Sequence, residues 1–142
     1  MTERMSTALK RTVAARAHDR CEYCQSPAAI ATQSFTIDHI RPRASGGKTR
    51  LNNLAWACLG CNHHKHTKRK VIDPLTQKSV QLFNPRRQAW SEHFAWNEDA
   101  TRIIGQTPCG RATVEALQLN RPALVNLRRI LVLANVHPPS EE

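Results

Sequence analysis

Two identical cysteine pairs constrain this sequence more than any other feature. Cys21 and Cys24 form one C-x-x-C pair, and Cys58 and Cys61 form the second. Two thiolates separated by two residues can bind one ion from a tight turn, and two such pairs complete the tetrahedral four-thiolate set that structural zinc prefers. We therefore expect one Zn²⁺ to fasten together the two ends of the segment between the pairs.

The cysteine pairs also have two other interpretations. A single C-x-x-C can be a thioredoxin-like redox motif, and buried thiols can fall into such a pattern by chance. Zinc is favoured because it accounts for both pairs at once. A site of four cysteines leaves the ion no open position, so this zinc would stabilise the fold, and any catalysis would need a second site. The fifth cysteine, Cys109, has no predicted role.

Composition indicates the kind of partner. The chain has 142 residues, enough for one domain with a modest core, and its 21 Lys and Arg against 11 Asp and Glu give a formal net charge of +10. Such an excess favours nucleic acid or another acidic partner, although a basic surface can serve solubility alone. No stretch has the apolar length of a signal peptide or a membrane span, so we expect a cytoplasmic protein with reduced thiols and no membrane partner.

Changes of composition along the chain predict four parts. They are a basic helical region at 1–20, a metal-binding core at 21–72, an extension packed on the core at 73–136, and a disordered tail at 137–142. Helical patterns predict helices over 6–19, from 59 to about 70, over 112–118 and after Pro122. β-Branched and aromatic runs predict strands within 30–40, at 54–57, at 80–83 and at 102–104. The expected fold class is therefore α+β.

An acidic residue and a histidine stand together at the end of the first predicted strand. In the stretch "FTIDHIRPRASGG", Asp38 and His39 follow an apolar run, and Pro42 ends the strand. Neighbouring strand residues point to opposite faces, but the chain can twist where pairing ends, so both side chains can flank one bound group. A carboxylate suits Mg²⁺ or Mn²⁺, and a neutral imidazole can take a proton from water. The pair therefore suggests metal-assisted hydrolysis of a phosphodiester.

Polar residues near the second cysteine pair can complete this site. Asn62 directly follows Cys61, and His66 comes one helical turn later, so both can face the strands. Asn53 precedes the second strand, where its amide could hold the loop after His39 by hydrogen bonds. Each has an ordinary alternative role, because asparagine often caps turns and histidine in a basic helix is often solvated.

The motifs from Cys21 to His66, which include "IDHIRPRASGG" and "NNLAWACLGCNHHK", resemble the HNH endonucleases. The resemblance implies a ββα-metal core with zinc-binding cysteine turns, flanked by an N-terminal helix and a mostly helical C-terminal extension like that of stand-alone bacterial members. It also implies that His39 is the general base and that Asp38 is a ligand of the catalytic ion. Asn53 would stabilise the loop and orient the base.

The third position of the motif departs from the family's name. Many members have a histidine where this chain has Asn62, and members with asparagine there still bind a magnesium-type ion. Asn62 is therefore expected to ligate the catalytic Mg²⁺ or Mn²⁺ together with Asp38. His66 matches a helix histidine that some members use, and Zn²⁺ or Ni²⁺ fits only if it is a ligand. Because His63 and His64 are adjacent, the sequence leaves open which imidazole approaches the ion.

The resemblance further implies an enzyme that hydrolyses DNA and leaves 5′-phosphate and 3′-hydroxyl ends. One active site per chain predicts nicking, and contacts to the backbone alone predict weak sequence preference and steep salt dependence. The residues expected to contact DNA phosphates are basic and surround the motif: Arg41, Arg43, Lys48, Lys65, Lys68 and Arg69. Any one of them could instead be a solvated charge. The sequence leaves open whether the protein is a monomer or a homodimer.

Two non-catalytic functions share part of this pattern. A zinc-ribbon module that binds DNA would need the cysteines and the charge, but it gives Asp38, His39 and Asn62 no joint task. An adaptor protein would use the aromatic C-terminal half for recognition and would have little affinity for DNA. Metal-dependent cleavage of DNA separates the nuclease from both.

Overall fold

The structure, a computed structural model, describes residues 6–140. The chain divides after Thr67 into an N-terminal unit and a C-terminal unit, each with its own buried core. Both units combine helices with two-stranded antiparallel sheets, which confirms the α+β class. Residues 1–5 and 141–142, which belong to the predicted N-terminal region and tail, lie outside the described residues. None of the helices within 6–140 has the length and apolar character needed to span a bilayer.

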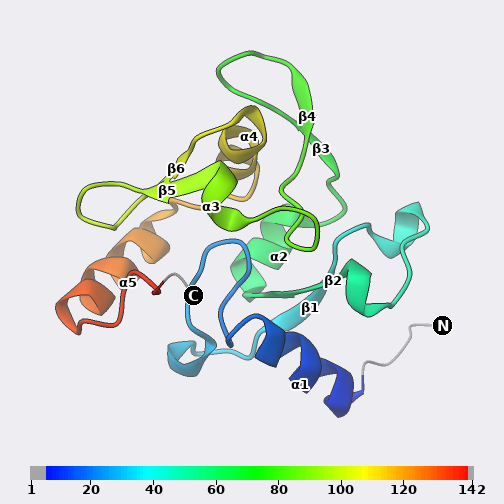
Figure 1. Cartoon of the computed structure of the whole chain (residues 1–142), viewed down its shortest axis with the longest axis horizontal. Helices are drawn as coiled ribbons and strands as arrows, with labels where there is room; N and C mark the ends of the chain where they lie inside the picture. Colours follow the sequence, from blue (N-terminus) through cyan, green and yellow to red (C-terminus); the bar gives the residue numbers. More distant parts are fainter. Residues whose placement is uncertain (1–5, 141–142) are drawn as a thin grey trace. The chain divides into compact units, whose positions relative to one another are not determined.

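The N-terminal unit is built on one β-hairpin and the helix that follows it (Figure 1). Its helices and strands are, in chain order, α1 (Thr7–Arg16), β1 (Thr36–His39), β2 (Leu54–Ala57) and α2 (Leu59–Lys65). β1 pairs antiparallel with β2, so that His39 lies opposite Leu54, and all four residues of β2 are buried. α2 begins directly after Cys58 and packs against β1. The unit therefore has strand, strand and helix in the order that the resemblance implied.

The first helix, α1, packs against both strands of the hairpin. Val13 is fully buried at this contact. The Arg16 guanidinium, in the last turn of α1, donates hydrogen bonds to the main-chain oxygens of Leu51 and Leu54 at 2.9 and 2.7 Å. These two bonds tie α1 to the chain on both sides of Asn53.

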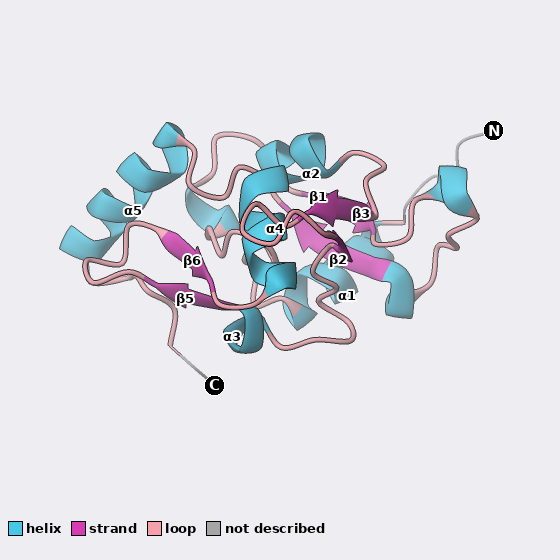
Figure 2. Ribbon diagram, turned by 90° about the horizontal axis from the view of Figure 1, so that it is seen from above, coloured by secondary structure: helices cyan, strands magenta, loops and turns pink. Residues whose placement is uncertain are grey.

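The C-terminal unit contains two hairpins and three helices among its described residues. Its elements are β3 (Lys70–Ile72), β4 (Ser79–Gln81), α3 (Trp90–His93), β5 (Phe94–Trp96), β6 (Ile103–Gly105), α4 (Pro108–Ala116) and α5 (Pro122–Leu133). β3 pairs with β4, and β5 pairs with β6, both antiparallel. α4 packs against β6 (Figure 2). It also contacts β3 and β4, so this helix joins the two hairpins.

Aromatic side chains form the centre of the C-terminal unit. Phe83 and Phe94 are each 2% exposed, and their rings meet edge to face with centroids 5.2 Å apart. The ring of Trp90 lies 5.1 Å from that of Phe94 and 5.4 Å from that of Trp96. Since aromatic rings bury large apolar areas, Phe83 and Phe94 form a packed core, and the partly exposed Trp90 and Trp96 extend this aromatic cluster.

Two polar networks fix the loops of this unit. The Arg111 guanidinium on α4 donates two hydrogen bonds to the fully buried carboxylate of Asp73, at 3.1 and 3.0 Å. The Asn120 amide pairs with the main-chain N–H and C=O of Ile103 at 2.7 and 2.8 Å, and Arg128 donates to the same amide oxygen at 3.2 Å. The hairpins are therefore joined to both long helices by side chains.

Three predicted element bounds are wrong in the N-terminal unit. The helix expected over 6–19 covers only Thr7–Arg16. The helix expected to reach about residue 70 ends at Lys65, because His66 has a positive φ of 48°, outside the helical region. The strand expected within 30–40 covers only β1, and a 3₁₀ turn over Ala28–Ile30 precedes it.

The tail also differs from expectation at its start. His137 is the first residue of the segment that the sequence predicts to be disordered, and its side chain is buried. Its imidazole packs edge-on against Trp96 with centroids 4.4 Å apart, and its Nε2 lies 2.9 Å from the main-chain oxygen of Ala100. Order therefore extends beyond the end of α5.

Candidate metal centre and active site

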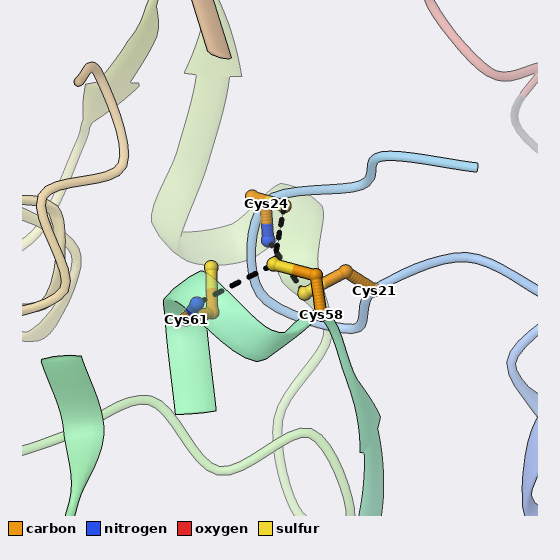
Figure 3. Close-up of side chains that lie close together, drawn as sticks. All are labelled: Cys21, Cys24, Cys58 and Cys61. Carbon is orange, nitrogen blue, oxygen red and sulfur yellow. Dashed lines mark hydrogen bonds between the residues drawn. The ribbon is translucent and has the colours of Figure 1, made fainter. Parts of the chain in front are cut away.

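The four paired cysteines converge on one point (Figure 3). Their sulfur atoms all lie within 4.8 Å of one another, and the sulfurs of Cys24 and Cys58 are 3.7 Å apart. In each pair, the main-chain N–H of the second cysteine donates to the sulfur of the first at 3.4 Å. Among residues 6–140, no other group of three or more histidine, cysteine or carboxylate side chains brings ligand atoms this close together.

This arrangement fits a tetrahedral zinc ion. Zn–S bonds of about 2.3 Å at tetrahedral angles place neighbouring sulfur atoms about 3.8 Å apart. The sulfurs of Cys24 and Cys58 have nearly this spacing. The N–H groups that point at Cys21 and Cys58 also favour a negative charge on those sulfurs. The residues present therefore fit the four-thiolate site that the spacing predicts.

The clustered thiols change one another's acidity. Burial raises the pKa of Cys21, whereas hydrogen bonds from neighbouring thiols, that of Cys21 first, lower the pKa of Cys58. The cluster therefore favours a thiolate at Cys58, and the thiolate is the form that binds zinc.

Main-chain contacts bring the two cysteine pairs together. Glu22, inside the first pair, donates its N–H to the C=O of Trp56 at 2.9 Å, and its carboxylate accepts the N–H of Trp56 at 2.7 Å. Trp56 lies in β2, two residues before Cys58. These contacts between the first cysteine turn and β2 therefore place one pair beside the other.

Asp38 lies inside the unit and is hydrogen-bonded at both carboxylate oxygens. Its side chain is 4% exposed. One oxygen accepts from the Tyr23 hydroxyl at 2.7 Å, and the other accepts from the Lys65 ammonium at 3.1 Å. Burial raises the pKa of Asp38, and the charge of Lys65 and the Tyr23 bond oppose this rise. Tyr23 and Lys65 belong to the segments that carry the first and the second cysteine pair.

Lys65 is almost fully buried, with 1% of its surface exposed. Besides Asp38, its ammonium donates to the main-chain oxygens of His39 at 3.1 Å and of Ile40 at 3.2 Å. An ammonium has three donors, and here each has an acceptor. The prediction that Lys65 contacts DNA phosphates is therefore wrong, because its charge is directed into the hairpin.

His39 has a different set of partners from Asp38. The N–H of Ile40 donates to the C=O of Asn53 at 2.9 Å, so main-chain pairing continues one residue past His39. The His39 imidazole is partly buried, and its Nε2 lies 2.9 Å from the hydroxyl of Thr49. Lys65 therefore links the two neighbouring residues, because its ammonium donates to the Asp38 carboxylate and to the main-chain oxygen of His39.

Asn53 closes the loop that follows β1. Its amide nitrogen donates to the main-chain oxygens of Arg41 and Lys48 at 3.1 and 2.8 Å, and its amide oxygen accepts the N–H of Arg41 at 2.8 Å. Gly47 is required in this loop because a Cβ there would lie 1.7 Å from the main-chain oxygen of Arg41. The hydrogen bonds of Asn53 therefore fix the loop in which Thr49 lies, and with it the hydroxyl that contacts His39.

Asn62 lies in the middle of α2, and His66 is the residue directly after its last turn. Asn62 is partly buried, and its main-chain oxygen accepts the N–H of His66 at 2.9 Å. Because Asn62 comes three residues before Lys65, its side chain lies on the same side of α2 as the ammonium that reaches Asp38. His66 is exposed and, within 6–140, belongs to no group of three ligand side chains.

The other basic residues predicted to contact DNA are exposed. Those on the loop after β1 are Arg41, Arg43 and Lys48, and those at the start of the C-terminal unit are Lys68 and Arg69. Sequence reasoning missed Tyr23, Thr49 and Arg16. Tyr23 gave one signal, a hydroxyl-bearing aromatic residue inside a cysteine turn, whereas nothing in the local pattern distinguishes Thr49.

A comparison with family models matches residues 21–68 to the HNH endonuclease family. No curated protein and no solved structure gives a significant match to the chain. The matched segment contains β1, β2 and α2 together with all four clustered cysteines. Its order of elements is the one described above for the N-terminal unit. Residues 21–68 therefore form a segment that matches the HNH endonuclease family, and they contain a candidate four-cysteine zinc site.

Proposed function

We propose that this protein is a divalent-metal-dependent endonuclease that nicks DNA with low sequence specificity. The observation that carries the proposal is the position of His39. It lies inside the segment that matches the HNH family, at the end of the hairpin, with its imidazole against a loop that Asn53 fixes. That loop also presents exposed arginine and lysine side chains suited to a phosphate backbone.

In this proposal His39 is the general base. Its imidazole is oriented by Thr49 and remains partly exposed, so that water can approach it. A neutral imidazole has the pKa to take a proton from an attacking water near neutral pH, and a positioned base contributes about 10²–10⁴-fold to such reactions. Asn53 acts through the loop and is a positioning residue.

The catalytic Mg²⁺ or Mn²⁺ would be ligated by Asp38 and Asn62. Each Asp38 oxygen accepts one hydrogen bond and retains a lone pair, and Asn62 offers an amide oxygen from the same side of α2 as Lys65. Since Mg²⁺ usually keeps several waters, two protein ligands suffice. When bound, the ion supplies Lewis-acid stabilisation of charge on the phosphate and the leaving oxygen. His66 would be a third ligand if the ion were Zn²⁺ or Ni²⁺.

The partner in this proposal is the DNA backbone. Contacts from Arg41, Arg43 and Lys48, and from Lys68 and Arg69, would position a strand without reading its bases. One HNH domain per chain would cut one strand, leaving a 5′-phosphate and a 3′-hydroxyl, whereas a homodimer could cut both. A cytoplasmic setting fits the proposal because the zinc site needs reduced cysteines.

Nicking of supercoiled plasmid tests the proposal. Zinc-loaded protein is incubated with plasmid at low salt, with Mg²⁺, with Mn²⁺ and without added divalent ion, and DNA binding is measured in parallel. Open-circular product should appear with the added ions only. Binding without nicking under every condition would favour a non-catalytic zinc domain that binds DNA, and the absence of both would favour an adaptor.

A further inference from the structure

We infer that Tyr23 and Lys65 are positioning residues that fix Asp38 and the end of β1, and that they connect the proposed nuclease site to the zinc cluster. This inference rests on the proposed function. Its basis is that both groups bonded to the Asp38 carboxylate come from segments that carry the cysteine pairs.

Tyr23 is the connection from the first cysteine pair. It lies between Cys21 and Cys24 and is 1% exposed. Its hydroxyl donates to Asp38 at 2.7 Å, a short bond to a buried carboxylate. Because the ring sits in a turn whose two cysteines would share one ion, bound zinc would also fix the direction of the hydroxyl.

Lys65 is the connection from the second pair. It comes one helical turn after Cys61 on α2, and its ammonium meets Asp38 and the main-chain oxygens of His39 and Ile40. A lysine that only carried surface charge would not be buried with all three donors satisfied. The two main-chain contacts set the direction in which β1 leaves the hairpin, and with it the position of His39.

Together the two residues select one orientation of the Asp38 carboxylate. The Tyr23 bond holds one oxygen and the Lys65 bond holds the other, so each oxygen presents its remaining lone pair in a fixed direction. A zinc ion that performs no chemistry would thereby determine the geometry of the catalytic groups. Groups that orient ligands in this way typically change metal affinity or activity by about 10- to 100-fold when they are removed.

A double-mutant cycle on stability tests the network without any need for activity. Thermal unfolding is measured for Lys65→Met, Asp38→Asn and the double variant, each with its zinc content confirmed. Asp38→Asn should lower Tm strongly because it leaves a buried ammonium without its carboxylate, and adding Lys65→Met should recover part of that loss. If the fall in Tm of the double variant equalled the sum of the falls in the two single variants, the inference would be overturned. Tyr23→Phe is the milder variant and can be measured even if Asp38→Asn does not fold. It should lower Tm and weaken Mn²⁺ binding.

Kinetics then separate positioning from DNA contact. In zinc-loaded, folded protein, Lys65→Met and Tyr23→Phe should lower kcat for nicking about 10- to 100-fold, with KM for DNA and the salt dependence of binding unchanged. Lys10→Met, an exposed lysine of α1, is the matched control and should change neither. Weaker DNA binding with unchanged kcat in Lys65→Met would overturn the inference. Absence of nicking by the wild type would instead reject the proposed function, and the stability cycle would still report on the network.

Discussion

The Asn53 amide pairs with both main-chain groups of Arg41, accepting the N–H at 2.8 Å and donating to the C=O at 3.1 Å. The same amide nitrogen also donates to Lys48 at 2.8 Å, so one side chain joins the two ends of the loop that follows β1. That loop leads to Thr49, the hydroxyl partner of His39.

Replacing Asn53 with alanine should therefore loosen the loop and misplace His39. Each lost hydrogen bond costs about 0.5–1.5 kcal/mol of stability, and nicking should fall about 10- to 100-fold. Urea unfolding and plasmid nicking measure the two effects. Asn52→Ala, at the exposed neighbouring position, is the control and should behave as wild type. Undiminished nicking by Asn53→Ala would show that the loop does not orient the base.

Gly47→Ala should disturb the same loop by steric conflict. The added Cβ would lie 1.7 Å from the main-chain oxygen of Arg41, so the loop must move. Forced overpacking of this kind costs about 1–3 kcal/mol. The free energy of unfolding in urea checks the cost, with Ala44→Ser as an exposed control on the same loop. Equal stability of Gly47→Ala and wild type would mean that the loop has another conformation in solution.

Zinc removal should unfold the N-terminal unit. We expect about one zinc per chain in the wild type and little in Cys58→Ser, which loses a ligand. Because zinc binding and folding are coupled, Cys58→Ser should lose the thermal transition of the N-terminal unit. Metal analysis and circular dichroism measure both. Cys109→Ser, outside the cluster, should keep its zinc. A Cys58→Ser variant as stable as wild type would rule out a structural zinc site.

The Asp73–Arg111 pair should make stability depend on acid pH. The Arg111 guanidinium lowers the pKa of Asp73, so the folded state binds this proton more weakly than the unfolded state. The stabilising contribution is therefore present above the unfolded value of about 3.9 and is lost as pH falls through the folded pKa. Arg111→Met should lower Tm at pH 7 and flatten its fall below about pH 4. Thermal unfolding measured across this pH range checks the prediction, with the exposed Arg102→Met as the control. Parallel curves of Tm against pH for Arg111→Met and wild type would contradict it.

The cysteine cluster and the hairpin could be predicted because their signals are local. Two C-x-x-C pairs require a short turn each, and the bounds of β2 follow from a run of apolar residues. The end of α2 could not be predicted in the same way. No helix breaker follows Lys65, and the helix ends there because His66 takes a positive φ.

The hydrogen-bond partners of Asp38 could not be predicted from the sequence, for a different reason. A lysine in a basic segment looks like a surface charge, and only the packing of α2 on β1 shows that the Lys65 ammonium meets three acceptors. The direction of His39 likewise depends on how far strand pairing continues, which is set by the Ile40–Asn53 hydrogen bond. Sequence motifs thus drew attention to Asp38 and His39, whereas the contacts that each of them makes required the fold.

Plasmid nicking by His39→Ala tests the central claim most directly. The variant should match wild type in zinc content, Tm and DNA affinity, and its nicking with Mg²⁺ or Mn²⁺ should fall at least about 100-fold, because a positioned general base has been removed. Metal-dependent nicking by His39→Ala at the wild-type rate would contradict the assignment of His39 and with it the proposed active site.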